Sequence, residues 1–131
     1  MPAIEHCYQA DYSLVGFTSE EKAKIITAFS ELNIHIGNDF SPIVLHDKIC
    51  VHPSDIAIIG QNANTVKICR EGVVYIQFKQ KNFQIPTTPV EIELVGKPNL
   101  NEWQGEFTPQ LFIENMVITP IENQVNSYDF L

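Results

Sequence analysis

The sequence contains no long apolar run, which excludes a helix that spans a membrane. Such a helix needs about 18 or more consecutive apolar residues. The first residues, from Met1 to His6, show neither the basic region nor the apolar region of a secretion signal. The three cysteines, Cys7, Cys50 and Cys69, stand at irregular spacing, which argues against a disulfide framework. We therefore expect a cytoplasmic protein with no membrane partner.

Recognisable catalytic motifs are also absent, and so is a clear metal site. The aspartates are dispersed and do not have the spacing of metal ligands. His46, Cys50 and His52 lie close together in the sequence, but a fourth ligand is missing. Cys50 lies in a short apolar run, where we expect it to fill part of the core. We expect no metal, no cofactor and no catalysis from this chain alone.

Negative charge dominates the sequence, but its distribution is uneven. The net charge of −8 argues against nonspecific nucleic-acid binding by the chain as a whole. Between Lys48 and Lys81, however, five bases accompany only two acids, Asp55 and Glu71, so this window has a net charge of +3. It would attract phosphates weakly and with strong salt dependence. The alternative is that these bases only solubilise the surfaces of strands.

A helix is predicted before the β-rich part of the chain. Thr18 as N-cap and Glu21 three residues later form a capping box, and apolar residues at helical spacing continue to about Asn33. Runs of β-branched and aromatic residues, separated by turn residues, then predict five strands. These strands are expected at residues 49–59 with a bend at Pro53, and at residues 65–69, 73–79, 90–95 and 110–118, with tight turns at residues 70–72 and 104–105.

This order of elements predicts a mainly β fold. The best match is a five-stranded, OB-fold-like Greek-key barrel preceded by an N-terminal amphipathic helix. An SH3-like barrel is the alternative, because the number of strands does not separate the two folds. The predicted organisation is a helix-containing lead-in segment at residues 1–45, the barrel at residues 46–119, and a polar C-terminal tail at residues 120–131.

Six short segments give the sequence its most specific pattern. They read Ile-Ile-Gly at residues 58–60, Val-Lys-Ile at 66–68, Val-Tyr-Ile-Gln-Phe at 74–78, Val-Gly-Lys at 95–97, Asn-Glu-Trp-Gln-Gly at 101–105 and Pro-Gln-Leu-Phe-Ile-Glu at 109–114. In this order they resemble the C-terminal OB-fold region of the bacterial RecJ family, single-stranded-DNA-specific exonucleases of the DHH superfamily. The resemblance implies a non-catalytic module that binds and positions single-stranded DNA in repair and recombination. The Mn²⁺ or Mg²⁺ of the nuclease reaction would belong to a nuclease core in cis, whose Asp-His-His motif this chain does not contain.

OB-folds bind single strands with a groove that follows the phosphates and with aromatic side chains that stack on bases. Strands two and three usually form the binding face. Alternation along residues 73–79 gives one purely apolar set, Val74, Ile76 and Phe78, which we expect in the core. The other set, with Tyr75, should face outward together with Lys67 of the neighbouring strand. The predicted nucleic-acid-binding residues are Lys67, Arg70, Tyr75, Gln77, Lys79 and Lys81.

Trp103 is expected to have a structural role, and the alternative is that it stacks on a base. Glu102 and Glu106 lie beside it and would repel phosphate. A lone tryptophan more often packs on a barrel while its ring N–H finds a partner. We therefore expect Trp103 to pack on the barrel, in a hairpin that closes it.

Protein binding is the second class of function that the sequence allows. An acidic OB domain of this kind would dock a repair protein, such as single-strand-binding protein, or brace a RecJ-type nuclease core, without binding DNA itself. DNA binding by a basic face should weaken steeply as salt rises, whereas docking through apolar contacts should not.

Overall fold

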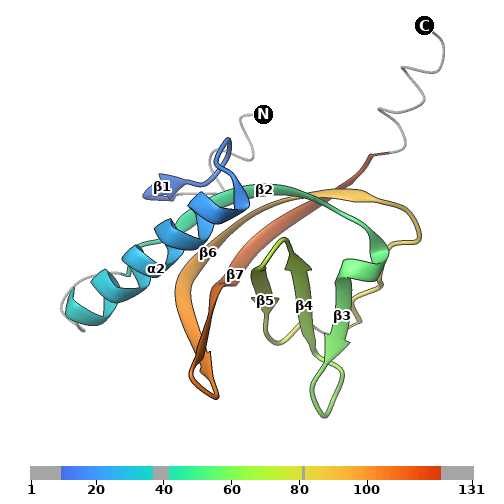
Figure 1. The fold of residues 1–131 in the computed structure, drawn as a ribbon. Coiled ribbons are helices and arrows are strands. Elements are labelled where there is room, and N and C mark those ends of the chain that lie inside the picture. The colour runs from blue at the N-terminus through green and yellow to red at the C-terminus, as the bar shows by residue number, and fades with distance from the viewer. Residues whose placement is uncertain (1–9, 37–41, 81, 122–131) are drawn as a thin grey trace, which may run out of the picture.

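A computed structural model of the chain describes residues 10–36, 42–80 and 82–121. The predicted helix is present as α2 (Ser19–Ile36), three residues longer than expected, and its capping box is confirmed. The Glu21 backbone N–H donates to the Thr18 hydroxyl at 3.2 Å, and the Thr18 N–H donates to the Glu21 carboxylate at 2.9 Å. A short 3-10 helix, η1 (Pro53–Asp55), follows later in the chain. The prediction of a mainly β chain with an N-terminal helix is therefore confirmed (Figure 1).

The predicted number of strands is wrong, because the described residues form seven strands in one mixed sheet. The order in the sheet is β1-β2-β6-β7-β5-β4-β3, and the sheet is open. The run expected at residues 49–59 divides at Pro53 into two strands that do not pair with each other. The strands are β1 (Tyr12–Ser13), β2 (Leu45–Val51), β3 (Ile56–Ile59), β4 (Thr65–Arg70), β5 (Val73–Gln77), β6 (Val90–Trp103) and β7 (Glu106–Pro120).

The β6–β7 hairpin is the longest feature of the sheet, and both of its strands extend well beyond the predicted runs. Its turn is at Gln104 and Gly105, as predicted, with φ angles of 51° and 83°. Positive φ at both central positions is typical of the type I′ turn that favours hairpins. The register shifts between Val95 and Gly96, where a bulge interrupts the pairing. Such bulges bend a strand, and both strands of the hairpin are strongly curved in Figure 1.

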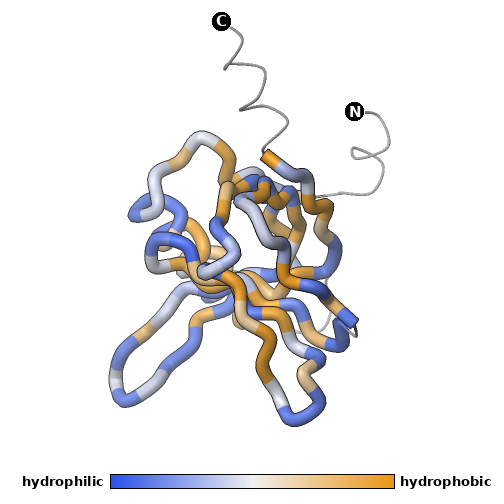
Figure 2. The backbone as a smooth tube through the Cα atoms, turned by 90° about the vertical axis from the view of Figure 1, so that its right-hand side faces the viewer, coloured by the Kyte–Doolittle hydropathy of each residue, from blue (hydrophilic) through white to orange (hydrophobic). Residues whose placement is uncertain are grey.

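The hydrophobic core lies inside the curved sheet, and α2 contributes to it. Ile26 of the helix and Leu14 before it are fully buried in the same cluster as the strand residues. Hydrophobic stretches of the chain cross the middle of the molecule, while two loops that project from one end of it finish in hydrophilic residues (Figure 2). Thus the helical segment and the strands share one core. The predicted tail lies outside the described residues, except for its first two positions.

Candidate nucleic-acid interface

Tyr75 is a core residue, which corrects the prediction that it faces outward. Its side chain is 1% exposed, and the Tyr75 hydroxyl donates a hydrogen bond of 2.7 Å to Asp47 Oδ2. Burial, followed by the charge of Asp47, raises the pKa of Tyr75 above its usual range. The assignment of faces on β5 is therefore inverted: Val73 and Tyr75 point into the core, and Val74 and Ile76 point away from it.

Asp47 is a buried charged residue that was not predicted from the sequence. It is fully buried on β2, where it occupies a core position between Leu45 and Ile49. Its carboxylate also forms an ion pair of 3.0 Å with Lys22 Nζ on α2. A buried carboxylate is stable only when it is paired and hydrogen-bonded, and Asp47 has both kinds of partner. The sequence feature that could have indicated a buried acid is a single aspartate at an inward position of a strand whose other inward residues are apolar.

The structure divides the predicted binding residues between two faces and one turn. Arg70 lies on the same side of β4 as the buried Ile68 and forms an ion pair of 3.3 Å with Glu71. Gln77 pairs with the buried Val66, and its amide oxygen is buried without a hydrogen-bond partner in the described structure. Lys79 is exposed in a turn after β5, and Lys81 lies outside the described residues.

Only Lys67 keeps the predicted outward orientation on a strand, and it belongs to a row of paired residues. The row runs Lys97, Phe112, Ile76, Lys67 across β6, β7, β5 and β4. Phe78 packs edge-to-face on Phe112 with ring centroids 5.4 Å apart, and 54% of its surface is exposed. We call these five residues the outer patch. The patch combines two aromatic rings with two lysines on the face of the sheet opposite the core.

Electrostatics differ between the two lysines of the outer patch. Lys97 forms an ion pair of 3.4 Å with Glu114, and both side chains are nearly half exposed. Within the described residues Lys67 has no ion-pair partner. An exposed ion pair contributes little to stability and can exchange partners with an arriving phosphate. Of the two lysines of the outer patch, Lys67 is therefore the one that a phosphate can approach without displacing a carboxylate.

Trp103 does not pack on the sheet, which corrects a second prediction. It is 71% exposed at the tip of the β6–β7 hairpin, where Phe107 is 58% exposed on the opposite face. By strand alternation Trp103 lies on the same face of β6 as Lys97 of the outer patch. The hairpin projects from one end of the molecule, so it does not close a barrel (Figure 1).

Cys50 is exposed as well, so the expectation that it fills the core is wrong. His46 is engaged elsewhere, with Nε2 2.7 Å from Glu93 Oε2 and Nδ1 2.9 Å from Ser13 Oγ. The described part of the chain has no group of three His, Cys, Asp or Glu side chains placed to hold a metal ion. Its residues therefore do not fit the Mn²⁺ or Mg²⁺ that RecJ nuclease chemistry would use.

No described helix is long and apolar enough to cross a membrane.

A second surface lies between α2 and the inner face of the β6–β7 hairpin. It is a groove with a volume of about 650 Å³. Leu100, Phe107 and Pro109 form its hairpin side, and the helix side is mostly of small residues. The Lys24 and Glu31 side chains also line it, so its apolar floor is bordered by one charge of each sign.

Comparisons with known proteins identify the fold and leave the family unassigned. No model of a protein family matches the chain, and no curated protein matches it. Among solved structures, the chain is similar to the crystal structure of RecJ from Thermus thermophilus in complex with Mn²⁺, with a TM-score of 0.52 and 15% sequence identity. The match covers 72% of this chain and 14% of that chain. The chain therefore shares the fold of a small part of that protein.

Proposed function

We propose that this chain is a non-catalytic OB-type module that binds and positions single-stranded DNA, beside a RecJ-type nuclease core, in cytoplasmic DNA repair and recombination. The similarity in fold to a part of RecJ supports the setting. The outer patch supports the binding itself, because two aromatic rings and two lysines lie together on one face of the sheet. Stacking on aromatic rings and a cationic path for phosphates are the two features with which proteins hold single strands.

The dimensions of the outer patch suit a few nucleotides. Lys97 and Lys67 are separated by three strand spacings, which is about 14 Å. Phe112 and Phe78 lie between or beside them, so a base can stack where the backbone passes from one lysine to the other. The binding surface is thus shifted from the predicted set: Lys67 stays, Tyr75 leaves, and Phe78, Phe112 and Lys97 enter.

A titration of labelled oligo-dT at about 50 mM salt tests this proposal, because phosphate contacts are strong under that condition. The double variant Lys67→Gln, Lys97→Gln should weaken oligo-dT binding. The negative slope of the logarithm of the binding constant against the logarithm of the salt concentration should become shallower by about 0.7 per lost contact. Lys24→Gln is the matched control, since Lys24 is 78% exposed on α2, away from the patch. The absence of binding by the wild type, or equal effects of all lysines, would reject the outer patch.

Protein docking is the second candidate function, and the α2–hairpin groove favours it. Phe107 is exposed beside an apolar floor, and exposed aromatic residues commonly anchor protein interfaces. In this alternative the chain braces a nuclease core or docks single-strand-binding protein. Phe107→Ser should then abolish binding to a purified RecJ-type nuclease core and leave oligo-dT binding unchanged. If Phe107→Ser weakened oligo-dT binding and left binding to the nuclease core unchanged, docking through the groove would be rejected.

A further inference from the structure

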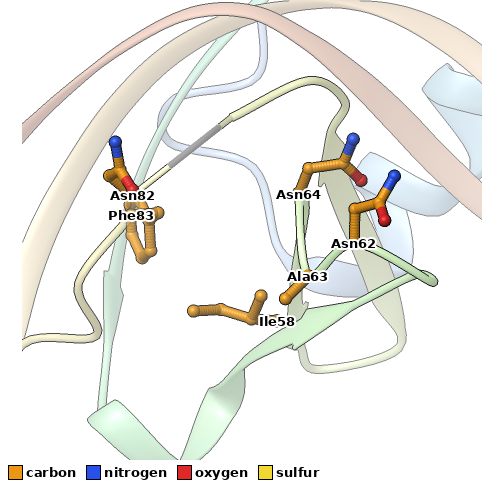
Figure 3. Close-up of a pocket in the computed structure, with 6 residues that line it drawn as sticks. All are labelled: Ile58, Asn62, Ala63, Asn64, Asn82 and Phe83. Atoms are coloured by element: carbon orange, nitrogen blue, oxygen red, sulfur yellow. The ribbon is translucent and has the colours of Figure 1, made fainter.

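A polar pocket lies at the end of β3, β4 and β5, and neither proposed function uses it. Its volume is about 530 Å³, which is within the range of small-molecule sites. The loop between β3 and β4 forms one wall and residues 82–83, after β5, form the other. Asn62 and Asn64 lie on the opposite side of the pocket from Phe83 and Asn82, with Ile58 and Ala63 below them (Figure 3).

The walls of this pocket are held by the backbone, so the pocket exists without a ligand. The Gln80 N–H donates to the Asn64 carbonyl at 2.8 Å, which anchors the segment after β5 to the loop that forms the first wall. The Ala63 N–H donates to the Gly60 carbonyl at 3.1 Å and closes the loop of the other wall. Asn82 has a φ of 60°, a left-handed conformation that asparagine tolerates better than most residues.

The chemistry of the lining selects for a neutral, flat and polar ligand. Three primary amides line the pocket, and a primary amide carries donors and an acceptor; the Asn64 oxygen already accepts from the Thr65 hydroxyl at 3.5 Å. No described lining residue carries a charge, so the pocket does not favour a free phosphate or a metal ion. Phe83 and Ile58 supply apolar surface. A nucleobase matches all three properties, since its edge alternates donors and acceptors and its face stacks on an aromatic ring.

We propose that this pocket accepts one unstacked base of a single strand that crosses the outer patch, and so gives the module a base preference. The inference rests on the proposed DNA binding. Thr65, which begins β4, follows Asn64 directly and lies two positions before Lys67 of the patch. Phe78 of the patch directly follows the last residue of β5, before the segment that forms the second wall. Ile58 of the pocket pairs with the buried Val66, so the pocket lies on the core side of the sheet, and a strand that leaves the patch must pass round the ends of β3 and β4 to reach it.

The test compares 12-residue oligomers of dA, dC and dT at one salt concentration. The wild type should bind one of the three oligomers most tightly. Asn62→Ala or Asn82→Gly should lower the affinity for that oligomer by roughly 5- to 100-fold, so that the affinities for the three oligomers become similar. Glycine at position 82 keeps the positive φ and removes only the amide. Gln61→Ala is the matched control, because Gln61 is an exposed amide of the same loop that does not line the pocket. Equal affinities for all oligomers in the wild type, or no effect of the pocket variants, would overturn the inference and leave the outer patch standing.

Free nucleosides test the pocket independently of the patch, because they carry no phosphate. Titration into ¹⁵N-labelled protein should shift the side-chain amide signals of Asn62, Asn64 and Asn82, while that of Gln61 stays in place. OB-folds also bind oligosaccharides, so maltotriose is titrated in parallel. Shifts with maltotriose alone, or with no nucleoside at all, would exclude a nucleobase pocket. If the wild type fails to bind any oligomer but the nucleosides shift these signals, the proposed DNA binding fails and the pocket remains.

Discussion

The hydroxyl of Tyr75 donates to the carboxylate of Asp47 across 2.7 Å in the interior of the protein. These residues belong to β5 and β2, which are not neighbours in the sheet. Lys22 of α2 binds the other oxygen of the same carboxylate. One buried acid therefore links β2, β5 and α2 through side chains, although β2 and β5 are not neighbours in the sheet.

Removal of this hydroxyl should destabilise the protein. Tyr75→Phe leaves one oxygen of a fully buried carboxylate without its partner, at a cost of about 1–3 kcal/mol in the free energy of unfolding. Urea denaturation measures the change. Tyr12→Phe is the control, because Tyr12 is 42% exposed, and its effect should stay within about 0.5 kcal/mol. Equal effects of both variants would contradict the role of the Asp47 contact.

Alkaline pH should remove part of the stability that Tyr75 provides. The hydroxyl is neutral in both states below pH 10, the ordinary tyrosine value. Above that pH the unfolded chain loses the proton, while the native state keeps it because burial raises the pKa of Tyr75. Stability should therefore fall as pH rises, by about 1.4 kcal/mol per unit from this group. The advantage of wild type over Tyr75→Phe should shrink between pH 9 and 11, and a constant difference would show that Tyr75 titrates normally.

Two glycines of the β6–β7 hairpin should respond differently to substitution. A Cβ at Gly96 would lie 2.8 Å from the Phe112 carbonyl oxygen, so Gly96→Ala should cost about 1–3 kcal/mol through crowding. Gly105 has open space but a φ of 83°, so Gly105→Ala should cost about 1–2 kcal/mol through conformation. Asparagine tolerates positive φ, so Gly105→Asn should be nearly neutral whereas Gly96→Asn should be as harmful as Gly96→Ala. Thermal unfolding of the four variants decides this.

Exposed thiols provide a chemical test of where the binding surface lies on the outer face of the sheet. Cys50 and Cys69 should both react with a maleimide in the native protein, because both are exposed. Cys69 lies on the outer-patch side of β4, opposite Val74, whereas Cys50 lies on β2 opposite Glu91. In variants that keep only one of the two, with Cys7 also replaced by serine, a bulky label on Cys69 should weaken oligo-dT binding roughly tenfold or more. The same label on Cys50 should leave binding unchanged.

Local features of this fold were predictable from the sequence, and long-range features were not. The Thr18–Glu21 capping box and the turn at Gln104 and Gly105 depend on residues a few positions apart, and both were predicted correctly. Alternation separated the two faces of β5 but did not say which face is buried. That choice depends on Asp47, 28 positions away, which makes the core the better environment for the Tyr75 hydroxyl.

The candidate site was found only in part for the same reason. Lys67 was placed correctly because its apolar neighbours on β4 are purely aliphatic, which leaves one orientation for the strand. Phe78 was assigned to the core because apolar residues usually are buried, and Phe112 was not among the predicted binding residues. Their contact follows from the parallel pairing of β5 with β7, which brings distant segments together on the outer face. Pairing between strands so far apart in the sequence leaves no local signal.

The long hairpin has a consequence for the order of folding. β2 pairs with β6 on one side of it and β5 pairs with β7 on the other, so the remaining strands are added to its two edges. Its own pairing is local and closes over a two-residue turn, whereas the β5–β7 pairing must close a long loop first. Substitutions at Gly105 should therefore mainly slow refolding, and substitutions in the edge strand β3 should mainly accelerate unfolding. Stopped-flow measurements in urea would show these opposite effects as changes in different limbs of the chevron plot.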